Sequence, residues 1–133
     1  AWAGDAVASA GNDRAVRLWD PDTGRPVARF DLPMDNPAGL AAGPDGGHLF
    51  VAGSGVVRLD RATGAAETRF PPHTYGHQLG VAVSPGGTRL ATAGWDRTVQ
   101  VTTAPAGKPV RALTGHAGPV GAVAYSPDGA HLA

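Results

Sequence analysis

The sequence predicts an all-β chain made of a repeated unit of four antiparallel strands. One marker of the repeat is a turn, GPDGGHL, SPGGTRL and SPDGAHL, whose prolines lie 41 and 42 residues apart: Pro44, Pro85 and Pro127. A second marker is TGRPVARF, TGAAETRF and AGKPVRAL, whose glycines lie 40 and 43 residues apart: Gly24, Gly64 and Gly107. A shared period of about 40 residues is the length of one four-stranded blade of a β-propeller.

Residues 71–113 display the unit most completely. VAVS (81–84) ends at the turn SPGG, RLATAG (89–94) ends at the turn WDR, and TVQVT (98–102) precedes AGKPVRAL. Val, Leu and Thr favour a pleated surface, whereas Pro-Gly-Gly supplies the positive φ angles of a tight turn. No apolar period of 3.6 residues persists, so we expect no helix.

The other units follow the same order of strands and turns. Residues 1–30 form a partial blade whose three strands match the second to fourth strands of the repeat: 6–11, 15–19 and 25–30. Residues 31–70 form a degenerate blade with four predicted strands: 39–43, 49–54, 56–60 and 65–70. Residues 114–133 begin the next blade with a strand at 121–126. Because propellers close with four to eight blades, residues 1–133 are predicted to form an open ring of about three.

Composition and charge narrow the classes of function. Lys and Arg together number 11, as do Asp and Glu, so no net charge attracts nucleic acid or an anionic membrane. The absence of cysteine excludes a disulfide framework and a thiolate metal site. No apolar run approaches the ~20 residues of a membrane span, and AWAGDAVASA has no features of a targeting segment. We expect a cytoplasmic, bacterial segment of a longer protein, and ten Arg against one Lys is typical of a GC-rich genome.

Two stretches, RAVRLWDPDTGRPVARF and LTGHAGPVGAVAYSPDGAHLA, resemble the WD40 (Trp-Asp repeat) β-propellers. The resemblance covers nearly the whole chain and is weakest in residues 31–70. It implies four-stranded blades arranged radially around a central channel. In that family a blade is often fixed by a hydrogen-bonded His, Ser or Thr, Asp and Trp, which satisfy one another's polar groups inside a small core.

Carried over position by position, the resemblance assigns seven residues to this structural network: Ser9, Asp13, Trp19, His73, Thr92, Asp96 and His116. In the third unit Thr102 takes the position of the Trp. In the second unit Leu59 does so, and no Asp is available there. No unit of the chain is therefore predicted to hold the complete network.

No arrangement of residues predicts catalysis or a metal site. His73 and His77 have the i, i+4 spacing that aligns two metal ligands on a helix, but PPHTYGHQLG is not helical. Ser84 and Ser126 belong to turns, and the nucleophile-elbow pattern G-x-S-x-G is absent. His48 follows a Pro-Asp-Gly turn and is interpreted as solvent-facing. We therefore expect no enzyme activity, no metal and no cofactor.

Binding of a protein or peptide is what the resemblance implies instead. In the family, the loops between blades and the turns between second and third strands share one face, which often receives such partners. Trp95 is the first candidate, because a partly exposed Trp beside an Arg is typical of interface anchors. The alternative is that Trp95 folds back over the rim of its blade. The other candidates on this face are Arg97, Tyr75, His77, Arg14 and Met34.

Two hypotheses for function follow. The first is a non-catalytic scaffold for protein–protein interaction, and by analogy with bacterial relatives the regulatory segment of a larger signalling protein. The alternative rests on PDGGHLFVAGSGVVRLDRATG, which resembles lactonase-like propellers that hold a metal or a sugar in the central channel. The small apolar first strands GLAAG, GVAVS and GAVAYS favour the scaffold. In either case further blades of the same chain, or self-association, would close the ring.

Overall fold

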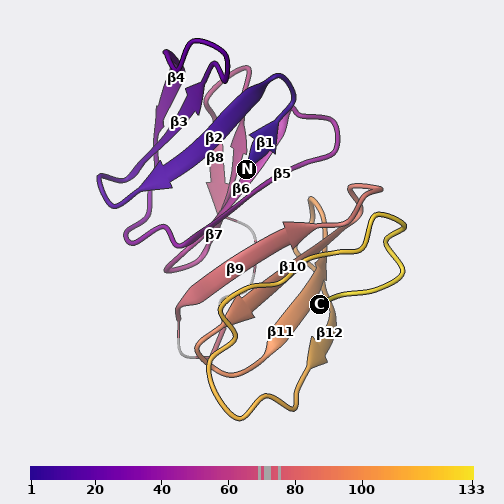
Figure 1. Ribbon diagram of the computed structural model, residues 1–133. Coiled ribbons are helices and arrows are strands. Elements are labelled where there is room, and N and C mark those ends of the chain that lie inside the picture. The colour runs from indigo at the N-terminus through magenta and orange to yellow at the C-terminus, as the bar shows by residue number, and fades with distance from the viewer. Residues whose placement is uncertain (69, 71–72, 75) are drawn as a thin grey trace.

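The computed structural model describes residues 1–68, 70, 73–74 and 76–133. All regular structure in these residues is β, and it forms three separate four-stranded antiparallel sheets (Figure 1). The prediction of an all-β fold with about three open blades is confirmed. No helix in the described residues is long and apolar enough to cross a membrane.

Each sheet is a meander whose strands pair in the order in which they occur along the chain. The first sheet contains β1 (Trp2–Ala3), β2 (Ala6–Gly11), β3 (Ala15–Trp19) and β4 (Pro26–Asp31). The second contains β5 (Gly39–Ala42), β6 (His48–Ala52), β7 (Val56–Asp60) and β8 (Ala66–Thr68). The third contains β9 (Gln78–Val83), β10 (Arg89–Gly94), β11 (Val99–Thr103) and β12 (Pro109–Leu113).

The two ends of the chain differ from the expected strand pattern. The first sheet has four strands instead of three, because the tight turn at Gly4, with φ of 66°, folds Trp2–Ala3 back onto β2. The strand expected at 121–126 is not formed. Residues 124–133 instead make a short hairpin, with a bridge between Tyr125 and Leu132 and hydrogen bonds between Ala124 and Ala133. This hairpin runs across the third sheet (yellow in Figure 1).

Apolar cores join successive sheets, and consecutive residues of a strand belong alternately to the core on one side of the sheet and to the core on the other. In β6, Leu49 and Val51 pack toward the first sheet, whereas Phe50 and Ala52 pack toward the third. This follows from the two-residue period of a strand, and it explains why HLFVA reads as a continuous apolar run. The described part of the third sheet packs in turn against residues 120–132. The second sheet is therefore covered on both faces.

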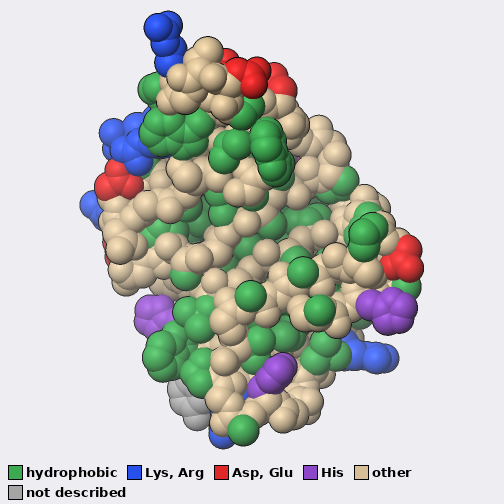
Figure 2. Space-filling model, in the orientation of Figure 1, with side chains coloured by type: hydrophobic (Ala, Val, Ile, Leu, Met, Phe, Trp, Pro, Cys, Tyr) green, Lys and Arg blue, Asp and Glu red, His purple; other side chains and the backbone are tan. Residues whose placement is uncertain are grey.

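The first sheet leaves one of its faces open. Hydrophobic side chains reach the surface over this sheet (Figure 2), where Trp2 and Val27 are 66% and 61% exposed. Val7 and Trp19 belong to the same face, because Trp2 pairs with Val7 and Val7 with Trp19 across the strands. An open face of this kind is what a propeller blade without a neighbour on that side presents.

The innermost strands approach one another closely, which explains their small residues. A Cβ added to Gly39 would lie 3.0 Å from Gly80 Cα, and a Cβ added to Gly80 would lie 2.9 Å from Ala122 Cα. Side chains at these positions would push neighbouring sheets apart, so the strands GLAAG and GVAVS need glycine where they meet.

Arg61 fixes the junction between the first and second sheets at the end where β1 turns into β2. Its Nη1 donates to the carbonyl oxygens of Ala3 at 2.7 Å and Gly46 at 3.1 Å, and its Nη2 lies 3.4 Å from Asp5 Oδ1. A single guanidinium thus joins two turns from different sheets. The several N–H donors of the guanidinium allow one arginine to bind acceptors in both turns.

Replacing this guanidinium tests the junction. We expect Arg61→Ala to lower the free energy of unfolding by about 1–3 kcal/mol, because hydrogen bonds from a charged group to two main-chain oxygens are lost. Urea denaturation measures the change, and Arg25→Ala, at an exposed turn position, is the matched control. Equal effects of the two substitutions would contradict the role assigned to Arg61.

Candidate functional site

The turns between second and third strands and the loops between sheets share one end of the sheets. Backbone hydrogen bonds tie them together: Leu32 N donates to Arg14 O at 2.7 Å, and Trp95 N donates to His77 O at 3.1 Å. On the other side of the same turn, Val120 N donates to Gly94 O at 3.1 Å. We call this end, formed by residues 12–14, 31–37, 53–55, 73–74, 76–78 and 95–97, the loop face.

Trp95 projects from the loop face into solvent. The residue is 56% exposed. Arg97, in the same turn, has φ of 67° and is exposed, and Arg14 has φ of 57° at the equivalent position of the first sheet. Arg14 lies 3.6 Å from Asp35, but both side chains are mostly exposed, so this ion pair contributes little to stability.

The other predicted contact residues have different positions. His77 is exposed on the loop face beside Trp95. Tyr75 lies outside the described residues. The prediction for Met34 is wrong: it is buried in the core between the first and second sheets. The cause is that residues 31–37 fold over the end of β6, where a Cβ on Gly53 would lie 2.6 Å from Met34 Cε.

A hydrogen-bonded network supports the turn that carries Trp95. His73 Nδ1 lies 2.7 Å from Asp96 Oδ1, and His73 Nε2 lies 3.0 Å from Thr92 Oγ1. Both Thr98 N and Thr98 Oγ1 donate to Asp96 Oδ1, at 3.1 and 2.7 Å. Since the ionised carboxylate can only accept, Nδ1 of His73 carries the proton. The third sheet thus brings together three of the seven predicted residues.

Burial and hydrogen bonding act in opposite directions on Asp96. Burial opposes its ionisation, but hydrogen bonds from His73 and Thr98 outweigh that effect, so the pKa of Asp96 lies below that of an ordinary aspartate. The network also requires Gly94, because a Cβ there would lie 2.5 Å from His73 Nδ1. Sequence reasoning missed Thr98; a hydroxyl two residues after an Asp in a turn was the available signal.

The first sheet holds a divided version of the network. Trp19 Nε1 donates to Ser9 Oγ at 2.8 Å. Asp13 does not join this pair in the described residues and instead accepts from Arg17 Nη2 at 2.5 Å, a bond that holds the pKa of Asp13 below its usual value. The Ser–Trp pair and the Asp are therefore separate features of this sheet.

The last of the seven predicted residues, His116, lies apart from these groups. His116 is exposed and lines a small hollow with Val120 and Leu132. Thr102, in the position of the Trp, is buried, and its hydroxyl has no hydrogen-bond partner among the described residues. The threonine hydroxyl that lies within hydrogen-bond distance of His73 Nε2 is the one of Thr92.

Sequence reasoning also misplaced His48. It is half-buried rather than solvent-facing, with Nδ1 3.1 Å from Asp45 Oδ2 and Nε2 2.6 Å from Arg58 Nη2. This cluster lies at the opposite end of the sheets from the loop face. No group of three or more His, Asp or Glu side chains suited to a metal ion occurs in the described residues.

The sheets, their order and their turns define segments of a β-propeller. The family model for the WD domain, G-beta repeat, matches residues 68–102 and 107–133. THO complex subunit 3 of Arabidopsis thaliana is 30% identical over 134 residues, which include 97% of this chain and 41% of that protein. With these matches, the chain belongs to the WD40-repeat family.

Two further relatives agree with this assignment. An uncharacterized WD repeat-containing protein of Synechocystis is 33% identical over 129 residues, which include 96% of this chain and 36% of the relative. Nuclear distribution protein PAC1 of Coccidioides posadasii is 26% identical over 151 residues, with 97% of this chain and 32% of that protein covered. The chain thus spans 32–41% of the length of these relatives.

The network of the third sheet can be tested at Asp96. We expect Asp96→Ala to lower the free energy of unfolding at pH 7 by about 1–3 kcal/mol, because His73 and Thr98 lose their acceptor. The folded-state pKa of Asp96 is depressed, so its contribution is present above the unfolded pKa of about 3.9 and is lost as the pH falls below it. The difference from the unsubstituted protein should therefore shrink toward pH 3.

Urea denaturation at the two pH values measures both effects. Asp22→Ala, at an exposed turn position, is the matched control and is expected to change stability little. A loss at Asp96 no larger than the control, or one that persists undiminished at pH 3, would contradict the network.

Proposed function

We propose that this chain is a non-catalytic scaffold that binds a protein partner through its loop face. The observation that carries the proposal is Trp95, a large apolar side chain that is 56% exposed on a turn held by buried hydrogen bonds. Interface anchors are typically Trp, Tyr or Arg on a base that loses little freedom on binding. The neighbouring Asp96 network supplies such a base.

The chemistry of the loop face indicates the kind of partner. Arg97 and Arg14 are exposed at equivalent turns, so both can present a guanidinium group to a partner. A protein segment that pairs an apolar side chain with acidic residues would complement Trp95 and these cations. His77, beside Trp95, would lie at the edge of the same contact.

The relatives support an interaction role for the whole protein. The Arabidopsis relative, THO complex subunit 3, is named as a subunit of a complex. We extend the proposal to a regulatory segment within a larger bacterial signalling protein; the Synechocystis relative, of which this chain covers 36%, supports only the bacterial and larger-protein parts of this extension. WD40 repeats act mainly as binding platforms, and fold-level analogy is the warrant for this extension.

Photo-crosslinking tests the binding face. We expect p-benzoylphenylalanine at position 95 to form a discrete crosslinked adduct with a partner in cells, whereas the same residue at position 22, which is exposed in the turn between β3 and β4, forms none. Trp95→Ala should reduce co-purification of that partner at least tenfold, since truncation of a Trp at the centre of an interface typically costs about 2 kcal/mol or more of binding free energy.

Trp2→Ala is the matched control, because Trp2 is 66% exposed away from the loop face. The proposal fails if Trp95→Ala and Trp2→Ala retain the same partners to the same extent, or if adducts form at position 22 and not at position 95.

A further inference from the structure

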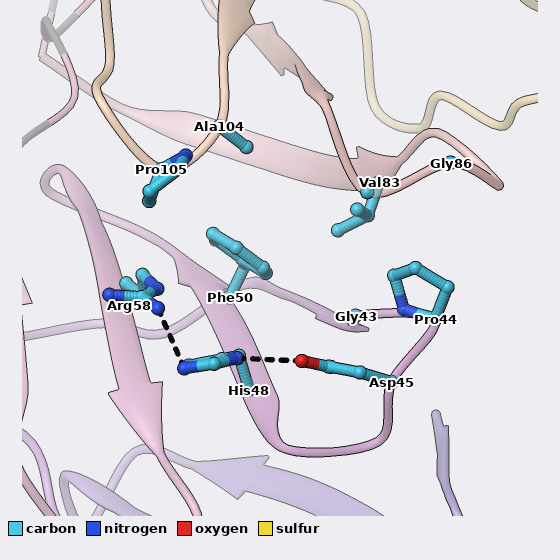
Figure 3. Close-up of a pocket in the computed structure, with 11 residues that line it drawn as sticks. Gly43, Pro44, Asp45, His48, Phe50, Arg58, Val83, Gly86, Ala104 and Pro105 are labelled. Atoms are coloured by element: carbon cyan, nitrogen blue, oxygen red, sulfur yellow. Dashed lines mark hydrogen bonds and ion pairs between the residues drawn. The ribbon is translucent and has the colours of Figure 1, made fainter.

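A cavity of about 310 Å³ opens at the junction of the second and third sheets, at the end opposite the loop face (Figure 3). The turn after β5 and the turn after β9 form two of its walls, and the turn after β11 forms a third. Phe50 projects into its middle, with Arg58 on one side and Pro44 on the other (Figure 3). No residue of the loop face lines it.

The repeat shows which side chain fills this place in the preceding junction. Arg61 N donates to Gly47 O at 2.9 Å, and Ala104 N donates to Thr88 O at 2.9 Å. These are the same bond in successive sheets, so Ala104 occupies the position of Arg61. Likewise Gly46 N donates to Gly43 O and Gly87 N to Ser84 O, so Gly87 occupies the position of Gly46.

The two junctions therefore differ by one guanidinium group. Between the first and second sheets, Arg61 donates to Ala3 O and Gly46 O and approaches the Asp5 carboxylate. Between the second and third sheets, the equivalent side chain is the methyl of Ala104, and the cavity lies against it. Gly87, whose carbonyl oxygen corresponds to that of Gly46, also lines the cavity.

The side chains around the cavity favour a cation. Arg58 must donate to His48 Nε2, so Nδ1 of His48 carries the proton and donates to Asp45. Arg58 also lies 3.6 Å from Glu67, so its positive charge is matched within the second sheet. Asp45 is the carboxylate that lines the cavity, whereas Asp60 does not line it and lies 3.6 Å from His48 Nε2. With the charge of Arg58 matched by Glu67, the Asp45 carboxylate and the ring of Phe50 suit a planar cation.

We propose that this cavity binds the guanidinium group of an arginine side chain from a partner protein, in the place that Arg61 occupies one junction earlier. The arginine would donate to the main-chain oxygen of Gly87 and to the carboxylate of Asp45, with its methylenes against Pro44 and Phe50. Asp45 is held ready for this role, because hydrogen bonds from the Gly47 amide and from His48 fix its two oxygens. This site is separate from the loop face, and neither proposal rests on the other.

A peptide titration followed by NMR tests the proposal. The probe is an end-blocked Gly-Gly-Arg-Gly-Gly peptide, and its control replaces the arginine by citrulline, which has nearly the same shape without the charge. We expect the arginine peptide to shift the amide signals of Gly86 and Gly87 in a saturable way, and the citrulline peptide to bind at least tenfold more weakly. Trp95→Ala should leave this titration unchanged.

Two variants place the binding in the cavity. Ala104→Arg is expected to fill the cavity from within the chain, to raise the midpoint of thermal unfolding, and to reduce binding of the arginine peptide at least tenfold. Ala106→Arg, two residues along the same turn and exposed, should retain full binding. Should Ala104→Arg fail to fold, the comparison of arginine with citrulline in the unsubstituted protein still decides.

Three outcomes would overturn the proposal. One is the absence of any saturable shift at Gly86 and Gly87 with the arginine peptide. Another is equal affinity for the arginine and citrulline peptides, which would show that the charge is not recognised. The third is undiminished binding in a folded Ala104→Arg variant.

Discussion

The face-to-face contact between successive sheets is the interaction on which the rest of this structure depends. A four-stranded meander has two faces, and in a propeller each face is buried only by the neighbouring blade. The second sheet fulfils this condition on both sides, with Leu49 and Phe50 directed to opposite neighbours. The positions of the turns, and hence of every candidate binding group, follow from how these sheets are stacked.

Much of the fold could be predicted from the sequence, because the strands and turns are determined by residues that are close together in the chain. The recurring Pro-Gly turns have a direct structural use: a Cβ on Gly87 would lie 3.2 Å from Pro44, and one on Gly129 would lie 3.3 Å from Pro85, so each turn packs on the preceding one. Features set by tertiary contact could not be predicted. Met34 is buried because a linking loop folds over β6, and the cavity beside Ala104 becomes evident only when side chains of two sheets are placed together.

The two ends of the sheets combine one backbone framework with different side chains. At the loop face a buried network holds an exposed Trp95. At the opposite end, Arg61 closes the junction between the first and second sheets, whereas the junction between the second and third sheets has a cavity at the equivalent position. Variation of turn residues on a constant sheet framework is how repeat proteins acquire distinct binding surfaces. Under the two proposals, the chain would present two kinds of contact to two different partner groups.

Hydrogen exchange in a core variant tests the dependence of one sheet on the next most directly. Leu59 is fully buried between the first and second sheets, and Leu59→Ala should remove about 2–5 kcal/mol of packing there. The account predicts faster amide exchange in β2 and β3 of the first sheet as well as in β7, with a smaller change in β10 and β11. Faster exchange confined to the second sheet, with β2 and β3 unchanged, would show that each sheet is stable on its own and would contradict the account.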